Sequence, residues 1–209
     1  LEDAGLSPGF LIGGLPGNFD VSARFAESEF FVVEADEYDT AFFDKRAKFV
    51  HYQPQTLVIT NLEFDHADIY DDMDEIYWQF HQLMRTIPAN GRVIVNVHDK
   101  DIARMLERGC WTPVEQFGLE DGSEWQAGFA DVGERHIRIA NVNGESAETM
   151  WKLGGAYNLE NAVAAVAAAA SAAVPLERAV DALSRFEGVK RRLERTATVA
   201  GVAVYDDFA

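Results

Sequence analysis

The chain alternates between short continuous apolar runs and longer segments in which apolar residues recur at helical spacing. Residues 30–33, 56–60 and 93–97 have the length and composition of strands that are buried on both faces. A shorter run at residues 10–12 ends in two glycines, which predicts a strand followed by a turn. Residues 73–87 carry apolar side chains three or four positions apart, which predicts an amphipathic helix.

Further helices are predicted between and after these strands. Residues 101–108 predict a short helix closed by Gly109, residues 159–173 predict an alanine-rich helix, and Pro175 opens another. The alternation of strands and helices predicts an α/β fold with a mainly parallel sheet flanked by helices. Ligands bind such sheets at the carboxyl ends of the strands, so polar residues that follow strands are candidates for a site.

Residues 111–153 have a different pattern. Short alternating runs are separated by Gly, Asp and Asn, and Asn143-Gly144 is a strong turn signal. We expect a small antiparallel β region here, beside the main sheet. Near the end of the chain, residues 196–200 and 202–205 predict two strands about a turn at Gly201.

Composition and charge exclude several classes of function. The 209 residues carry a formal net charge of -17, and the one basic run, residues 190–192, is short, so a nucleic-acid partner is not expected. No apolar run reaches the roughly 18–20 residues that span a bilayer, and no signal peptide is present, so no membrane contact is expected. Cys110 is the only cysteine, which rules out an internal disulfide and fits the reducing cytoplasm.

Two clusters of acidic residues, 34–39 and 61–68, each follow a predicted buried strand. Oxygen ligands such as Glu34 suit Mg²⁺, and a histidine flanked by acids, such as His66, can also bind a metal. Either cluster by itself also fits a solvated loop. Because the carboxyl ends of adjacent parallel strands meet at one edge of a sheet, the pair favours a shared metal site.

Three later segments carry further candidates. Asn158 and Asn161 lie three residues apart and share a helix face, where their amides suit a purine edge, although Asn158 fits a helix cap equally well. Arg191 and Arg192 offer planar donors to phosphate, or form an exposed basic loop. Asp207, the second of two adjacent aspartates, suits a ribose or a metal, or belongs to a turn.

Taken in order, these five segments resemble the Mur ligases of peptidoglycan synthesis, and the resemblance covers nearly the whole chain. It implies that residues 1–209 form the central ATP-binding domain, with residues 204–209 starting the hinge to a C-terminal domain. The chain begins at Leu1 and contains no Walker A motif. We therefore expect a fragment that lacks the P-loop and the N-terminal UDP-binding domain and has no ligase activity by itself.

Residues 38–52 are most similar to the murein peptide ligases within this family. That branch joins UDP-N-acetylmuramate to L-Ala-γ-D-Glu-meso-diaminopimelate: ATP phosphorylates the muramyl carboxylate, and the peptide amine then attacks the acyl phosphate. The alternative is the UDP-N-acetylmuramate–L-alanine ligase branch, which is shorter at this stretch. Two alternative functions lie outside the ligases. One is a metal-dependent phosphohydrolase that uses Asp65, His66 and Asp68, and the other is a noncatalytic nucleotide-binding module.

The resemblance also implies roles for individual residues. Glu34 and His66 match magnesium ligands, and His81, fifteen residues after His66, stands where several relatives have a carbamylated lysine. The remaining roles concern ATP and the UDP-sugar. Asn158 and Asn161 are expected to contact adenine, Arg191 and Arg192 the ATP phosphates, and Asp207 the ribose. Gly14 and Asn18 are expected near the UDP-sugar, and Asn61 is expected to bind substrate.

Overall fold

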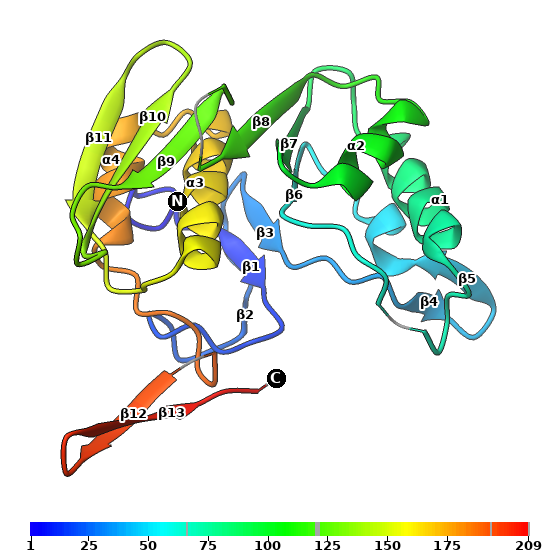
Figure 1. Cartoon of the computed structure of the whole chain (residues 1–209). Helices are drawn as coiled ribbons and strands as arrows, with labels where there is room; N and C mark the ends of the chain where they lie inside the picture. The colour runs from blue at the N-terminus through cyan, green and yellow to red at the C-terminus, as the bar shows by residue number, and fades with distance from the viewer. Residues whose placement is uncertain (66, 120–121, 193, 209) are drawn as a thin grey trace.

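A six-stranded sheet forms the centre of the computed structural model, which describes residues 1–65, 67–119, 122–192 and 194–208 (Figure 1). In spatial order the strands are β11 (Ser146–Met150), β10 (His136–Asn141), β9 (Trp125–Phe129), β8 (Val114–Gly118), β7 (Arg92–Asn96) and β6 (Thr56–Ile59). Strands β6 to β9 are parallel, whereas β9, β10 and β11 pair antiparallel. The predicted α/β fold with a mainly parallel sheet is confirmed.

Helices cover both faces of this sheet. One face carries α1 (Met73–Met84) and α2 (Lys100–Glu107), and the other carries α3 (Ala156–Ser171) and α4 (Leu176–Leu183). Successive side chains of a strand point to opposite faces, so Val93 and Val95 of β7 join the core under α1 and α2, and Ile94 joins the core under α3. All three are buried, as a continuous apolar run predicts.

A separate three-stranded sheet is formed by β1 (Gly9–Leu11), β2 (Ala23–Arg24) and β3 (Phe31–Val33), in the order β2-β1-β3. The strand predicted at residues 30–33 exists, but its predicted burial is wrong, because Phe31 is 55% exposed and Val32 is 45% exposed. Within the described residues, β3 pairs with β1 and not with β6. The two acidic clusters therefore do not follow adjacent strands of one sheet, contrary to the expectation.

The region 111–153 is only partly antiparallel. Strand β8 pairs parallel with β7, and β9 pairs parallel with β8, so both extend the parallel sheet. The antiparallel part begins only at the pairing of β9 with β10. The predicted Asn143-Gly144 turn is confirmed between β10 and β11, where Gly144 has φ +80°.

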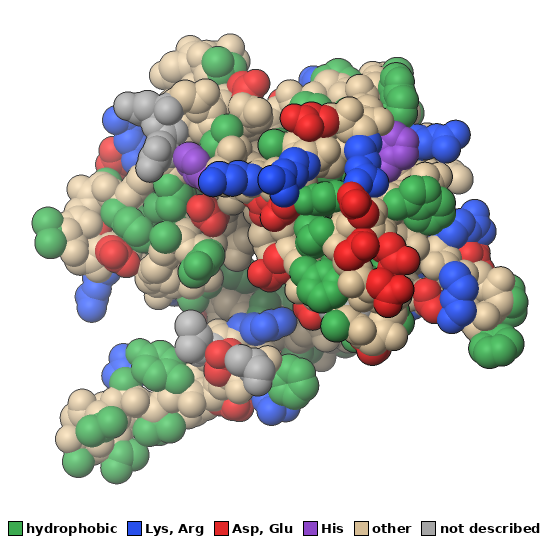
Figure 2. Space-filling model, turned by 45° about the vertical axis from the view of Figure 1, so that its right-hand side comes forward, with side chains coloured by type: hydrophobic (Ala, Val, Ile, Leu, Met, Phe, Trp, Pro, Cys, Tyr) green, Lys and Arg blue, Asp and Glu red, His purple; other side chains and the backbone are tan. Residues whose placement is uncertain are grey.

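Two hairpins lie outside the main sheet. Strands β4 (Asp39–Ala41) and β5 (Asp44–Ala47) form the first, which leads into a short 3-10 helix, η1 (Lys48–His51). Strands β12 (Glu194–Val199) and β13 (Val202–Asp206) form the second, which projects from the body of the molecule (Figure 1) and carries exposed apolar side chains (Figure 2). In the described part of the chain, no helix has the length and apolarity to cross a membrane.

Candidate functional site

Asn61 lies just beyond the carboxyl end of β6. Its side-chain amide accepts a hydrogen bond from the Thr60 hydroxyl (3.1 Å) and donates one to Glu63 (3.3 Å). The next residue, Leu62, donates its backbone N–H to the carboxylate of Asp99 (2.8 Å). Asp99 also accepts the N–H groups of Asp101 and Ile102 and so caps α2. It links the loop after β6 to the start of α2, a role that its position before a helical pattern could have indicated.

Asn158 and Asn161 lie in the first turns of α3, at the same edge of the main sheet as Asn61. The last residue of α3, Ser171, hydrogen-bonds to Thr56 at the amino end of β6 (2.9 Å). The first turn of α3 therefore lies at the carboxyl end of β6. Asn158 does not cap the helix: its amide donates to the carbonyl of Gly154 (2.8 Å), and the N-cap position is Gly155. The amide of Asn158 therefore lies at the first turn of α3, close to its exposed N-terminus.

Glu34 follows β3 in the smaller sheet. Its carboxylate accepts the backbone N–H of Gly13 at 2.7 Å, and its own N–H donates to the carbonyl of Leu11 (2.9 Å). A Cβ on Gly13 would lie 3.3 Å from the carboxylate, so a glycine lets this side chain fold against the turn. The second carboxylate oxygen makes no hydrogen bond with another described residue, and the side chain is exposed.

The loop after β1 is held against the segment that follows α4. Asn18 donates its side-chain amide to the carbonyl of Arg185 (2.7 Å) and accepts the N–H of Glu187 (2.9 Å). Gly14 packs so closely that a Cβ there would lie 2.5 Å from the Val189 side chain. Both candidates thus have a clear structural part in joining segments far apart in the sequence.

Arg191 connects that segment to the end of the chain. Its guanidinium lies 3.6 Å from the carboxylate of Asp206 and over the ring of Phe208, and its carbonyl accepts the N–H of Phe208. Arg192 is exposed, and Asp207 lies between the two residues that contact Arg191. The structure therefore brings together the 13–18 loop, the 185–192 segment and residues 206–208.

His81, expected where several relatives have a carbamylated lysine, lies away from Asn61 and Asn158. It occupies the last turn of α1, which leads from the loop after β6 back to the amino end of β7. Its ring packs 5.8 Å from that of Trp111, in the loop before β8, and its buried Nδ1 has no hydrogen-bond partner among the described residues. This is the opposite edge of the sheet from Asn61.

Of the two residues expected to hold Mg²⁺, only Glu34 is described, because His66 lies outside the described residues. Within them, no three His, Cys, Asp or Glu side chains are grouped as metal ligands. Glu34 still fits Mg²⁺, since this ion commonly uses one or two protein carboxylates and takes its other ligands from water and phosphate. Acidic side chains gather on the surface shown in Figure 2, in keeping with the net charge of -17.

Comparison with curated proteins gives close matches over the whole chain. It is 46% identical over 209 residues to the UDP-N-acetylmuramate–L-alanyl-γ-D-glutamyl-meso-2,6-diaminoheptandioate ligase of Haemophilus influenzae, and 49% identical to that of Escherichia coli. It covers 46% and 45% of these proteins, so it spans about half the length of either relative. A UDP-N-acetylmuramate–L-alanine ligase of Desulfitobacterium hafniense is 30% identical over 212 residues, and the match covers 100% of this chain and 45% of that protein.

Solved structures give the same result. The UDP-N-acetylmuramate:L-alanyl-γ-D-glutamyl-meso-diaminopimelate ligase from Neisseria meningitides is 50% identical with a TM-score of 0.83, and the match covers 91% of this chain and 61% of that one. The sequence profile of the Mur ligase middle domain matches residues 15–169. The chain therefore belongs to the Mur ligase family.

Proposed function

We propose that the protein carrying this chain joins UDP-N-acetylmuramate to L-alanyl-γ-D-glutamyl-meso-diaminopimelate in an ATP-dependent reaction in the cytoplasm. The chain supplies the middle, ATP-binding domain of that enzyme. The observation that carries the proposal is the difference in similarity: 46–49% identity to ligases named for this tripeptide, against 30% to a ligase named for L-alanine, in each case across the whole chain.

ATP binding is proposed at the edge where α3 begins. Asn158 and Asn161 offer amides to the adenine edge, and the purine would lie beside the first turn of this helix. Arg192 is exposed and has a planar set of donors for phosphate oxygens. Arg191 contacts Asp206 and Phe208, and Asp207, which lies between them in the sequence, is proposed to bind the ribose hydroxyls.

Glu34 is proposed as a ligand of Mg²⁺, because its carboxylate keeps one oxygen free of hydrogen bonds with described residues. His66 is proposed as the second protein ligand. When bound, Mg²⁺ would neutralise the charge on the phosphate oxygens during transfer. Gly14 and Asn18 hold the loop proposed to approach the UDP-sugar, and Asn61, just beyond the carboxyl end of β6, is proposed to bind substrate.

The proposed reaction has two steps. The carboxylate of the muramyl group takes the γ-phosphoryl group of ATP to form an acyl phosphate and ADP. The peptide amine then attacks the carbonyl carbon, and phosphate leaves the tetrahedral intermediate. Residues of this chain contribute mainly by positioning the reactants and by stabilising phosphate charge, which are the dominant effects in phosphoryl transfer.

An amine competition assay tests the proposal. The natural full-length protein receives ATP, Mg²⁺ and UDP-N-acetylmuramate with equal concentrations of the tripeptide and L-alanine, and mass spectrometry identifies the product. We expect the tripeptide product to dominate. A preference for L-alanine would instead support the alternative ligase branch, and the absence of any amide product would refute the ligase reaction.

A further inference from the structure

The turn between β9 and β10 reaches the start of α3. Glu134 in this turn accepts, with its carboxylate, the backbone N–H of Gly155, which is the N-cap residue of α3 (3.1 Å). The two residues lie 21 positions apart in the sequence, and the carboxylate makes no other hydrogen bond or ion pair with a described residue. Glu134 is exposed, so its side chain contributes nothing to the core.

The turn itself is held in shape by Asp131. The carboxylate of Asp131 accepts the backbone N–H groups of Arg135 and His136, both at 2.8 Å. The carbonyl of Arg135 accepts the N–H of Trp151, a buried residue in the segment that leads into α3 (2.7 Å). The turn and this segment are therefore joined by a backbone bond as well as by the carboxylate of Glu134.

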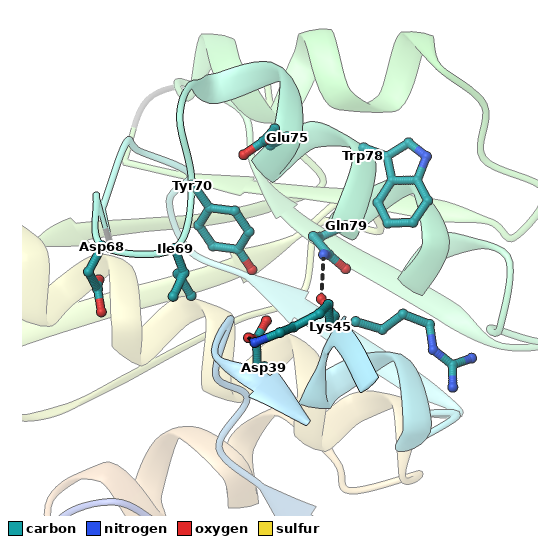
Figure 3. A pocket seen from close by; sticks show the side chains of 9 residues that line it. Asp39, Lys45, Asp68, Ile69, Tyr70, Glu75, Trp78 and Gln79 are labelled. Atoms are coloured by element: carbon teal, nitrogen blue, oxygen red, sulfur yellow. Dashed lines mark hydrogen bonds and ion pairs between the residues drawn. The ribbon is translucent and has the colours of Figure 1, made fainter. Parts of the chain in front are cut away.

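A polar side chain on another helix makes a comparable long-range contact (Figure 3). Gln79 of α1 is buried, accepts the backbone N–H of Ala47 (3.1 Å) and donates to the carbonyl of Lys45 (3.3 Å). In the cavity of about 690 Å³ beside it, the cations Lys45 and Arg46 already pair with carboxylates of the β4–β5 hairpin. Gln79 therefore fixes a hairpin, whereas Glu134 acts on a helix start that is proposed to bind ATP.

The bond from Gly155 to Glu134 takes the place of a local one. In a capping box, the side chain of the third helical residue accepts the N–H of the N-cap residue. The third residue of α3 is Asn158, whose side chain instead donates to the carbonyl of Gly154 (2.8 Å). Because Glu134 occupies the N–H of Gly155, the amide oxygen of Asn158 is left without a hydrogen bond to another described residue.

The orientation of the Asn158 amide decides which purine it matches. Its oxygen can accept the 6-amino group of adenine, and its second N–H can donate to N7. Guanine and hypoxanthine carry an oxygen at position 6, so the amide oxygen would face another acceptor. An amide turned so that its oxygen bonds to Gly155 would present N–H groups instead, and would lose the preference for adenine.

We propose that Glu134 is a positioning residue for the ATP site, because it accepts the N–H of Gly155 and so leaves the amide oxygen of Asn158 free to recognise adenine. This inference rests on the proposed ATP-dependent function and adds a residue that sets the purine preference of the nucleotide site. Glu134 acts through Gly155 and Asn158 and does not itself contact the nucleotide.

The test compares Glu134→Ala and Glu134→Gln in the full-length protein. Alanine removes the acceptor, whereas glutamine keeps an oxygen that can accept the N–H of Gly155. We expect Glu134→Ala to raise KM for ATP about tenfold, which is about 1.4 kcal/mol of binding free energy. The preference for ATP over inosine triphosphate, measured as the ratio of the two kcat/KM values, should fall by at least the same factor. KM for UDP-N-acetylmuramate and for the tripeptide should stay unchanged, and Glu134→Gln should stay near wild type in all of these values.

The matched control is Glu145→Ala. Glu145 lies in the turn at the other end of β10 and accepts the side-chain amide of Asn141 (2.7 Å), so its loss should change none of these values. An unchanged purine preference in Glu134→Ala would overturn the inference. A parallel rise in KM for all three substrates, or equal effects of alanine and glutamine at position 134, would overturn it as well.

Failure of the ligase proposal would give a different result. If the wild-type protein forms no amide product, calorimetry of ATP and inosine triphosphate binding to the same full-length proteins tests the positioning role alone. Weaker binding of ATP and a lower purine preference in Glu134→Ala than in Glu134→Gln would support that role. Identical affinities in wild type and both variants, or no binding of either nucleotide, would refute it.

Discussion

Replacing Gln79 with leucine should weaken the attachment of the β4–β5 hairpin by a measurable amount. Leucine is close in size to glutamine, so the change removes polar atoms without leaving a large cavity. The N–H of Ala47 loses its acceptor, and Ala47 is 0% exposed, so water cannot replace the lost bond. A buried donor left unpaired costs about 1–3 kcal/mol. The carbonyl of Lys45 lies near the surface and can bond to water instead, so it adds little.

The assay is urea unfolding of the 209-residue chain, followed by tryptophan fluorescence. We expect Gln79→Leu to lower the free energy of unfolding by about 1–3 kcal/mol. The matched control is Gln82→Leu on the same helix, where the half-buried side chain accepts a long bond from Arg85 (3.5 Å) and makes no other with a described residue. It should change stability by less than about 0.5 kcal/mol. Equal effects of the two substitutions would refute the claim that Gln79 holds the hairpin.

Three further changes test other parts of the structure. Arg192→Ala in the full-length protein should raise KM for ATP, while Arg138→Ala leaves it unchanged; an unaltered ATP dependence in Arg192→Ala would remove its phosphate role. Asp99→Ala should lower the free energy of unfolding by about 1–2 kcal/mol, and by more than Asp72→Ala, because Asp99 caps α2 and also holds Leu62; urea unfolding of both variants decides this. Burial, with the nearby carboxylates of Glu37 and Asp39, raises the pKa of Tyr70 to about 12 in the folded chain, from about 10 when unfolded. Its contribution to the free energy of unfolding is therefore complete below pH 10 and is lost as pH rises toward 12. Tyr70→Phe should make the free energy of unfolding fall less steeply with rising pH, as urea unfolding at several pH values would show. An identical fall in both proteins between pH 9 and 11 would contradict the raised pKa of Tyr70.

The strands of the main sheet could be predicted because their side chains are buried on both faces. Residues 93–95 are all apolar, and β7 indeed packs against helices on both sides. Residues 30–33 have the same pattern, yet β3 belongs to a small sheet and is partly exposed. An apolar run predicts a strand but does not specify what covers it. For the same reason, the alternating pattern of residues 111–153 did not reveal that β8 pairs parallel with β7.

The candidate site shows the same limit at the level of single residues. The resemblance suggested a place for His81 near His66, but His81 is the eighth residue after Met73, about 12 Å along the axis of α1. The helix carries it to the other edge of the sheet. The contacts of Asn18 with Arg185 and Glu187 could not be predicted either, because they join segments that lie far apart in the sequence.

Transfer of oxygen from the carboxylate to phosphate tests the proposed reaction most directly. UDP-N-acetylmuramate labelled with ¹⁸O in its muramyl carboxylate is converted by the full-length protein with ATP and the tripeptide, and the released phosphate is analysed by mass spectrometry. Activation as an acyl phosphate predicts one ¹⁸O atom in each phosphate, since the carboxylate oxygen that attacks ATP leaves with the phosphoryl group. Phosphate without the label would contradict an acyl phosphate intermediate.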